Sequence, residues 1–135
     1  MVGSVACVLD FPAHPREYRI FRPREDECPY QLLGLPKEDS VNLDSIRVAK
    51  HDDKVVAAYQ FDRLSSLTYV IDRLGVDESY RSRGLGSWML AHAVGIIESK
   101  GGREVIVHAP TCEFLSRFGF EAAGSNLMRL TLTAE

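Results

Sequence analysis

Two arginines and two glycines stand close together in residues 77–96, DESYRSRGLGSWMLAHAVGI. Arg81 and Arg83 carry guanidinium groups, which donate charge-assisted hydrogen bonds to phosphate oxygens. Gly84 and Gly86 have no Cβ, so an anion can approach the backbone closely. A helix that begins here adds unpaired N–H groups and the positive end of its dipole. The stretch therefore predicts a binding site for a pyrophosphate.

Two common phosphate-binding motifs do not match this stretch. A P-loop requires a lysine after its last glycine, whereas Gly86 is followed by Ser87. A dinucleotide-binding GxGxxG motif requires a third glycine where this chain has Met89. The pattern that is left is Arg81-x-x-Gly84-x-Gly86. A different nucleotide-binding protein, which would bind ATP or NAD tightly and CoA weakly, is kept as an alternative.

The arginine–glycine stretch lies between a predicted strand and a predicted helix. Residues 67–76, LTYVIDRLGV, are rich in the β-branched and aromatic residues that favour strands. From Gly84 to Lys100 apolar residues recur at helical spacing, and Gly101 and Gly102 follow as a stop. The phosphate-binding groups are therefore expected at a helix N-terminus.

The remaining elements are predicted from periodicity and breakers. In chain order we expect a strand at 17–21, a short or distorted helix in 23–35, a hairpin of strands 43–52 and 54–62 about His51, Asp52 and Asp53, a strand at 104–109, a short helix at 111–118 and a half-buried last strand at 126–133. This order predicts a mixed α/β fold, with residues 1–135 forming a single domain.

Composition excludes several classes of protein. Sixteen Lys and Arg against nineteen Asp and Glu give a net charge of −3, which argues against a non-specific nucleic-acid binder. No segment approaches the ~20 apolar residues of a membrane span, and no basic region precedes the apolar N-terminal run, so neither a membrane protein nor a signal peptide is expected. Cys7, Cys28 and Cys112 are too few and too scattered for a disulfide framework, and no metal-ligand spacing occurs. We therefore expect a cytoplasmic protein without a metal.

Two segments of the chain resemble one family. Residues 76–86, VDESYRSRGLG, match the pattern V-x-x-x-[FY]-[RQ]-x-x-G-x-G between a strand and a helix. Residues 107–124, VHAPTCEFLSRFGFEAAG, are similar to a later segment that usually ends in F-Y-x-x-x-G-F. Both patterns, in this order, resemble the GNAT N-acetyltransferase superfamily from about Ser45 onward. The resemblance implies a GNAT-like mixed, mostly antiparallel sheet flanked by helices, and acetyl-CoA as co-substrate.

The resemblance also implies which residues hold acetyl-CoA. In the family the strand before the motif splays from its neighbour and offers backbone groups to the pantetheine arm, which here assigns Leu74, Gly75 and Val76. A backbone N–H in that stretch is also a candidate for stabilising the oxyanion. The pyrophosphate would take the N–H groups of the motif, which are those of Arg81, Ser82, Arg83, Gly84, Leu85, Gly86 and Ser87. Phe114 is expected mainly in the core with Phe118 and Phe120, and is also a candidate lining of the thioester pocket.

A carboxylate precedes the cofactor stretch. Many family members carry an acid four positions before the valine that closes the strand, and here that residue is Asp72. Strict alternation would put Asp72 on one face with Val70, Leu74 and Val76, where an unpaired acid is costly. Asp72 is therefore a candidate general base for the attacking amine. The alternative is a structural ion pair with an arginine.

The later segment departs from the family pattern at one position. Leu115 stands where the family has the tyrosine that protonates the departing CoA thiolate, and leucine cannot donate a proton. A thiol is a tolerable leaving group near neutral pH, and water, Ser116 or another tyrosine could serve instead. His108 is treated as a strand residue, with a CoA or substrate contact as the lesser alternative.

These observations predict an N-acetyltransferase that moves an acetyl group from acetyl-CoA to a primary amine by direct attack in a ternary complex. The alternative is an acyl-CoA-binding sensor or partner module with little or no turnover, which Leu115 favours. The amine is either a small molecule or a peptide. The acidic run at 24–27 is interpreted as a solvated helix start, or less favourably as an attractor of a cationic amine. No nucleic-acid or membrane partner is expected, and a homodimer is possible in this family.

Overall fold

The computed structural model describes residues 19–35, 42–81, 84–110 and 112–132. The strands are β1 (Arg19–Phe21), β2 (Ile46–His51), β3 (Lys54–Arg63), β4 (Thr68–Val76), β5 (Glu104–Val107), β6 (Glu121–Gly124) and β7 (Leu127–Thr131). The helices are α2 (Tyr30–Leu33), α3 (Leu85–Ser99) and α4 (Glu113–Phe118), and short 3-10 turns lie at Glu25–Glu27, Leu43–Ser45 and Glu78–Tyr80.

The seven strands form one sheet in the order β1-β2-β3-β4-β5-β7-β6. Every neighbouring pair is antiparallel except β4 and β5, which are parallel and joined by α3. A parallel pair needs such a crossover, because its strands run in the same direction. The predicted mixed, mostly antiparallel sheet is confirmed.

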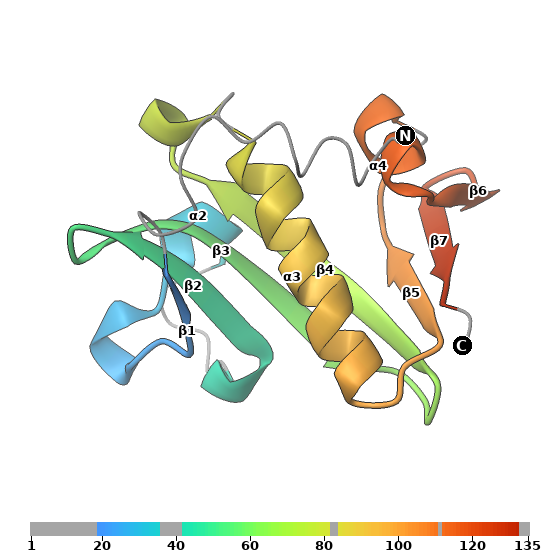
Figure 1. Cartoon of the computed structure of the whole chain (residues 1–135), viewed down its shortest axis with the longest axis horizontal. Helices are drawn as coiled ribbons and strands as arrows, with labels where there is room; N and C mark the ends of the chain where they lie inside the picture. The colour runs from blue at the N-terminus through green and yellow to red at the C-terminus, as the bar shows by residue number, and fades with distance from the viewer. Residues whose placement is uncertain (1–18, 36–41, 82–83, 111, 133–135) are drawn as a thin grey trace.

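Alternate residues of β3 send their side chains to opposite faces of the sheet. Ala57, Tyr59 and Phe61 belong to a large core cluster that includes α3 residues such as Met89 and Ile97. Ala58 belongs to a smaller cluster with Leu33 of α2. Helix α3 therefore covers one face of the sheet, and α2 covers the other (Figure 1).

The larger core contains one buried polar contact between the sheet and α3. The hydroxyl of Tyr59, fully buried, lies 2.7 Å from Nδ1 of His92. Burial raises the pKa of Tyr59, and burial together with the charge of Arg47 lowers the pKa of His92. Both groups are therefore neutral at pH 7, as a hydrogen bond beneath an apolar helix requires.

The sequence expectations hold for most elements, with three differences, of which the first is that β5 ends at Val107 rather than at residue 109. Leu43–Ser45 is a 3-10 turn that Asn42 caps through Asp44 N–H, rather than the start of a strand. Strand β6 was not predicted, and its residues are all exposed, which leaves no apolar alternation to detect. The hairpin at His51–Asp53 is confirmed, with Asp52 and Asp53 at φ 51° and 66° as a type I′ turn requires.

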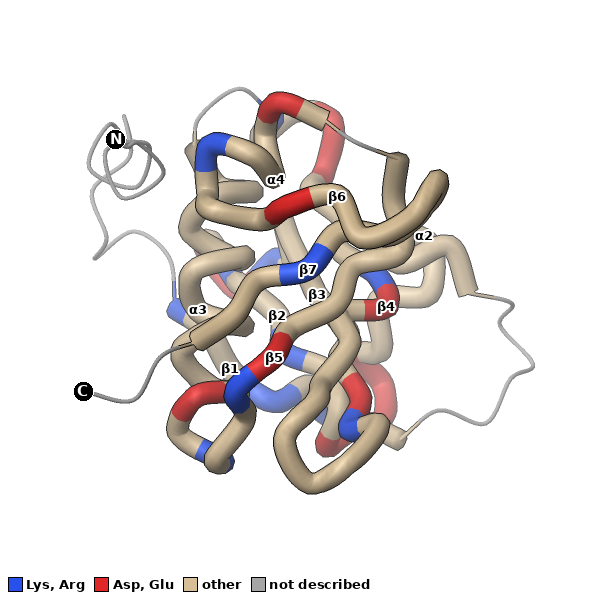
Figure 2. The backbone as a smooth tube through the Cα atoms, turned by 90° about the vertical axis from the view of Figure 1, so that its right-hand side faces the viewer, with Lys and Arg blue, Asp and Glu red and all other residues tan. Residues whose placement is uncertain are grey.

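Charged residues do not gather by sign on the face that Figure 2 presents, where acidic and basic segments are interspersed. One close pair there joins Arg129 of β7 to Glu104 of β5, at 3.6 Å between Nε and Oε2. In the described part of the chain, no helix is long and apolar enough to span a membrane. The same residues contain no group of three or more His, Cys, Asp or Glu that could hold a metal ion.

Candidate active site

Strands β4 and β5 pair over only part of their length. The parallel ladder joins Thr68–Ile71 to Glu104–Val107 and stops there, although β4 continues to Val76. In Figure 1 the two strands lie together at one end and diverge toward the other. Asp72–Val76 therefore have no partner on β5, while Arg73–Val76 are still paired with β3.

The ladder with β3 determines which backbone groups point into this opening. The N–H of Asp77 donates to the carbonyl of Val56 at 2.7 Å, which makes these residues a hydrogen-bonded pair. Such pairs alternate along antiparallel strands, so Gly75 also bonds to β3, opposite Ala58. The N–H and C=O groups of Leu74 and Val76 are consequently turned toward the β5 side.

Beyond β4 the chain leads to the N-terminus of α3. The N-cap Gly84 has φ 79°, which favours glycine, and no side chain caps the helix there. The first helical hydrogen bond runs from Trp88 N–H to Gly84 C=O at 3.1 Å, so the N–H groups of Leu85, Gly86 and Ser87 have no partner within the helix. A Cβ at Gly86 would approach only the Val76 side chain, at 3.9 Å. This end of α3 therefore fits an anion.

The side chains of this region have different surroundings. Nε of Arg81 donates to the carbonyl of Val76 at 3.1 Å, and the rest of this exposed guanidinium is near the end of β4. Leu85 is buried in the core, whereas Ser87 is half-buried. The predicted contacts of Ser82 and Arg83 lie outside the described residues.

Helix α2 sits directly on β4 at Gly75. A Cβ at Gly75 would lie 2.0 Å from the backbone oxygen of Leu32, so no side chain fits there. Two residues earlier, Nη1 of Arg73 donates to the carbonyl of Leu33 at 3.2 Å. Gly75 therefore places α2 against the strand that carries the open backbone groups.

The expectation that Val70 shares a face with Leu74 and Val76 is wrong, because β4 contains a β-bulge. Gln60 pairs with Arg73, but the next residue, Phe61, pairs with Ile71, which leaves Asp72 as an extra residue. Tyr69 and Ile71 before the bulge, and Leu74 and Val76 after it, all pack with the α3 core. Strict alternation across Asp72 fails here, so Val70 lies on the face opposite to Leu74 and Val76.

Asp72 lies at the point where β4 and β5 part. Ile71 and Val107 are the last residues in parallel register, so Asp72 and His108 are the next residue on each strand. The Asp72 side chain is exposed at the mouth of the opening, so its desolvation is only partial. This partial desolvation and the negative charge of Asp62 raise the pKa of Asp72, while the charges of His108 and Arg73 oppose the shift. A raised pKa makes this carboxyl group a better base than an ordinary aspartate.

The later motif contributes core residues and one exposed ring. Leu115 is 5% exposed and belongs to the α3 core, as do Phe120 and, at its edge, Phe118. Phe114 is 41% exposed, so the expectation that it lies mainly in the core is wrong. In a six-residue helix, consecutive positions point about 100° apart, and Leu115 takes the buried one.

A cavity of about 1110 Å³ lies beside the far end of β4. Its walls are residues 26–32, residues 53 and 55 of the β2–β3 hairpin, and residues 76–79 and 81 after β4. Five carboxylates line it, which are those of Asp26, Glu27, Asp53, Asp77 and Glu78. Hydrogen bonds from Lys50 to Glu27 and from Ser79 to Asp77 lower the pKa of each acid, so both are ionised at neutral pH.

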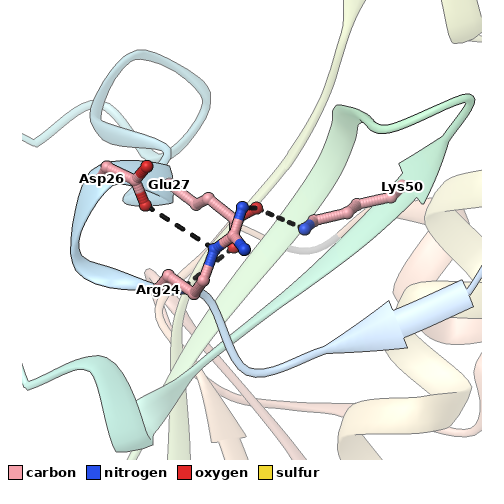
Figure 3. Close-up of polar contacts among 4 residues, drawn as sticks. All are labelled: Arg24, Asp26, Glu27 and Lys50. Carbon is pink, nitrogen blue, oxygen red and sulfur yellow. Dashed lines mark hydrogen bonds and ion pairs between the residues drawn. The ribbon is translucent and has the colours of Figure 1, made fainter.

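One wall of this cavity is tied to the sheet by ion pairs (Figure 3). Glu27 accepts from Lys50 of β2 and, at 3.1 Å, from Nη2 of Arg24. Arg24 also lies 3.8 Å from a carboxylate oxygen of Asp26. The 3-10 turn at Glu25–Glu27 is therefore anchored to β2, while α2 is anchored to β4.

Sequence analysis did not identify Asp62 and His108 as neighbours of Asp72. Asp62 is 10 residues before it and His108 is 36 residues after it, so their proximity comes from the β3–β4 register and the β4–β5 register. Strand β5 ends at Val107, one residue before His108. The expectation that His108 is a strand residue is therefore wrong. A histidine at the end of a strand next to the predicted site was the available signal.

Solved structures with the same fold share low sequence identity with this chain. A GNAT family acetyltransferase from Elizabethkingia anophelis with acetyl-CoA bound has a TM-score of 0.73 and 15% identity, over 86% of this chain and 99% of that one. The ribosomal-protein-S18-alanine N-acetyltransferase from Escherichia coli has a TM-score of 0.69 and 13% identity, over 87% and 96%.

N-acetylglutamate synthase from Neisseria gonorrhoeae, complexed with coenzyme A and N-acetyl-glutamate, has a TM-score of 0.75 and 15% identity over 87% of this chain. The match covers 35% of that longer protein. At these identities the likeness shows the fold. No curated protein sequence matches the chain.

The family model for the acetyltransferase (GNAT) family matches residues 10–120. This range contains β1 to α4, the open edge of β4 and the glycine N-cap of α3. The expected resemblance is thus confirmed over most of the sequence, and the chain belongs to the GNAT acetyltransferase family.

Proposed function

We propose that this protein transfers the acetyl group of acetyl-CoA to a primary amine by direct attack in a ternary complex. The observation that carries this proposal is the open edge of β4, where the backbone groups of Leu74 and Val76 face away from β3 and lead to the N-terminus of α3. An extended pantetheine arm can add to this edge as a further strand would. The pyrophosphate is then received by the N–H groups of Leu85, Gly86 and Ser87 with help from Arg81.

The reacting thioester lies, on this proposal, near Leu74 and Asp72. The N–H of Leu74 points toward the opening and is the donor we assign to the oxyanion that forms when the amine attacks. The amine attacks in its neutral form, because only a neutral amine is nucleophilic, and Asp72 takes the proton that the nitrogen loses as the C–N bond forms. Its raised pKa supports this role, since an ordinary aspartate, with a pKa near ~3.9, is a weak base at pH 7.

The acceptor is an amine of small size or at the end of a peptide. The N-acetylglutamate synthase and the ribosomal-protein-alanine acetyltransferase among the similar structures name one acceptor of each kind. Five carboxylates around the cavity beside Val76 support a cationic compound over an anionic one on that side of β4.

The test measures release of the CoA thiol from acetyl-CoA. The acceptors offered are L-glutamate, L-lysine, a polyamine and a peptide with an N-terminal alanine, each against a sample without acceptor. Acceptor-dependent release is the expected result, and mass spectrometry of the product then identifies the acetylated amine.

A second function, acyl-CoA binding without turnover, is favoured by buried Leu115 at the family's tyrosine position. It predicts that acetyl-CoA binds in calorimetry while every acceptor leaves thiol release at background. Binding of ATP or NAD in preference to CoA would contradict both functions.

A further inference from the structure

We propose that His108 is the general acid that protonates the departing CoA thiolate, in place of the tyrosine that Leu115 replaces. This inference rests on the proposed acetyltransferase function. It assigns a residue that donates the proton to the CoA thiolate, because the motif at 114–120 has no tyrosine to do so.

The first argument is the register of the open site. Ile71 and Val107 are the last residues in parallel register, and the strands part directly after them. Asp72 and His108 are therefore the first residue on each side of the opening. The charge of His108 also lowers the pKa of Asp72, which agrees with the positions that the register gives to the two residues.

The second argument is accessibility. Leu115 is buried in the α3 core, so this position of α4 does not face the opening. His108 is exposed and lies outside the sheet ladder, so its ring is free to turn toward a thioester held along β4. An imidazole ring both donates and accepts protons near neutral pH, as a group that must give a proton to sulfur requires.

The other protic side chains are less well placed. Tyr59 is fully buried and bonded to His92 under α3, and burial raises its pKa. Tyr80 lies beside His51 at the other edge of β3, at 3.0 Å between its hydroxyl and Nδ1. Ser116 is exposed on α4, and a hydroxyl of this kind is a much weaker acid than an imidazolium.

Two residues carry the protons in this step, one as acceptor and one as donor. The C–N bond forms while the C–S bond breaks, Asp72 takes the proton that the amine nitrogen loses, and the protonated ring of His108 gives a proton to the thiolate sulfur. Passage of a proton from Asp72 to His108 then restores both groups. The net reaction converts a thioester and an amine into an amide and a thiol.

Two further charges act on this pair. Asp62 of β3 raises the pKa of Asp72, and Arg73 of β4 lowers it. Both belong to the same end of the opening, so they influence how readily Asp72 returns its proton to His108. The proton transfer is thus confined to side chains that the bulge in β4 brings together.

The experiment compares the wild-type protein with His108→Ala, and with Ser116→Ala as the matched control, in the thiol-release assay. We use methoxyamine as the acceptor, because this weakly basic amine is already neutral near pH 7. The measured rate then does not include the deprotonation of the acceptor before it attacks. His108→Ala is expected to lower kcat about 100-fold with the KM for acetyl-CoA unchanged, a typical loss for a general acid. Ser116→Ala is expected to keep the wild-type rate.

Added imidazole supplies the readout that a structural role would not change. Free imidazole is expected to restore much of the rate of His108→Ala, and to have no effect on Asp72→Asn beyond the enzyme-free background.

A wild-type rate in His108→Ala, or a defect that imidazole does not restore, overturns the role of His108 while leaving the acetyltransferase function intact. A wild-type protein that releases no thiol with any acceptor overturns the proposed function and this inference together.

Discussion

The two edges of β4 have opposite roles. On the β3 side the ladder runs from Tyr69 to Val76 and is interrupted only at the bulge of Asp72. On the β5 side it stops at Ile71. The closed edge satisfies backbone groups within the fold, whereas on the open edge β5 offers no partner to Leu74 or Val76, and the Val76 carbonyl accepts instead from Arg81. A family site can therefore be built from an unpaired strand edge and needs few special side chains.

The closed edge is tested most severely at Gly75. Gly75→Ala places a Cβ 2.0 Å from the backbone oxygen of Leu32, so α2 must shift away from β4. We expect a loss of about 3 kcal/mol in the free energy of unfolding, measured by urea denaturation. The matched control is Gly95→Ala in α3, where a Cβ meets nothing within 4 Å and a gain of about 0.5–1 kcal/mol is expected. Equal stabilities for the two variants would contradict the close packing of α2 against Gly75.

The open edge is tested at Asp72. Asp72→Asn is expected to lower kcat about 100-fold, because the amine loses its base. The same variant should be slightly more stable than the wild type at neutral pH. The folded state raises the pKa of Asp72, so the wild-type acid supports folding only below its ordinary pKa and loses that contribution as pH rises through the raised value. Full activity in this variant would exclude Asp72 as the base.

Arg81 tests the phosphate end of the same edge. Arg81→Gln removes a charge-assisted donor next to the first turn of α3, and we expect acetyl-CoA to bind about 10-fold more weakly in calorimetry. The loss should shrink at high salt, because screening weakens the same interaction in the wild type. Arg129→Gln on β7 is the control and should leave the affinity unchanged.

The pH dependence of stability tests the core beneath α3, next to the closed edge. Burial lowers the pKa of His92, so its contribution to stability is complete above the ordinary pKa of histidine and is lost as pH falls through the lowered value. His92→Gln keeps a partner for the Tyr59 hydroxyl but cannot titrate. We expect this variant to lose less stability than the wild type between about pH 7 and about pH 5, by less than about 1 kcal/mol. Parallel curves for the two proteins would contradict the assignment.

The smallest effect is expected at the cavity wall that lies away from both edges. Glu27→Gln removes the ion pairs to Lys50 and Arg24, which are worth less than about 1 kcal/mol in denaturation experiments. Thiol release with methoxyamine should not change, because Glu27 pairs with Lys50 and Arg24 and is not among the charges that act on Asp72. A large loss of turnover would show that this wall takes part in the reaction.

Much of the fold and part of the site were predictable from local patterns. Residues 67–76 and 84–100 predicted a strand and a helix close to β4 and α3, and Gly84 was correctly expected at the helix N-terminus. The anion site there stays a prediction. The bulge at Asp72 was not predictable, because it exists only through the register between Gln60 and Arg73 on one side and Phe61 and Ile71 on the other. Strict alternation therefore gave the wrong face for Leu74 and Val76 relative to Tyr69 and Ile71.

The sequence by itself determined the elements, the family and the glycine N-cap of α3, because spacing, β-branched residues and conformational freedom act within a few positions of one another. Only the tertiary structure decided where the pairing of β4 with β5 ends, and that α2 packs closely against Gly75. The same register places His108 on the opposite side of the opening from Asp72. These features depend on pairing between segments far apart in the chain. Such pairing is set by packing of the whole sheet, which no local pattern contains.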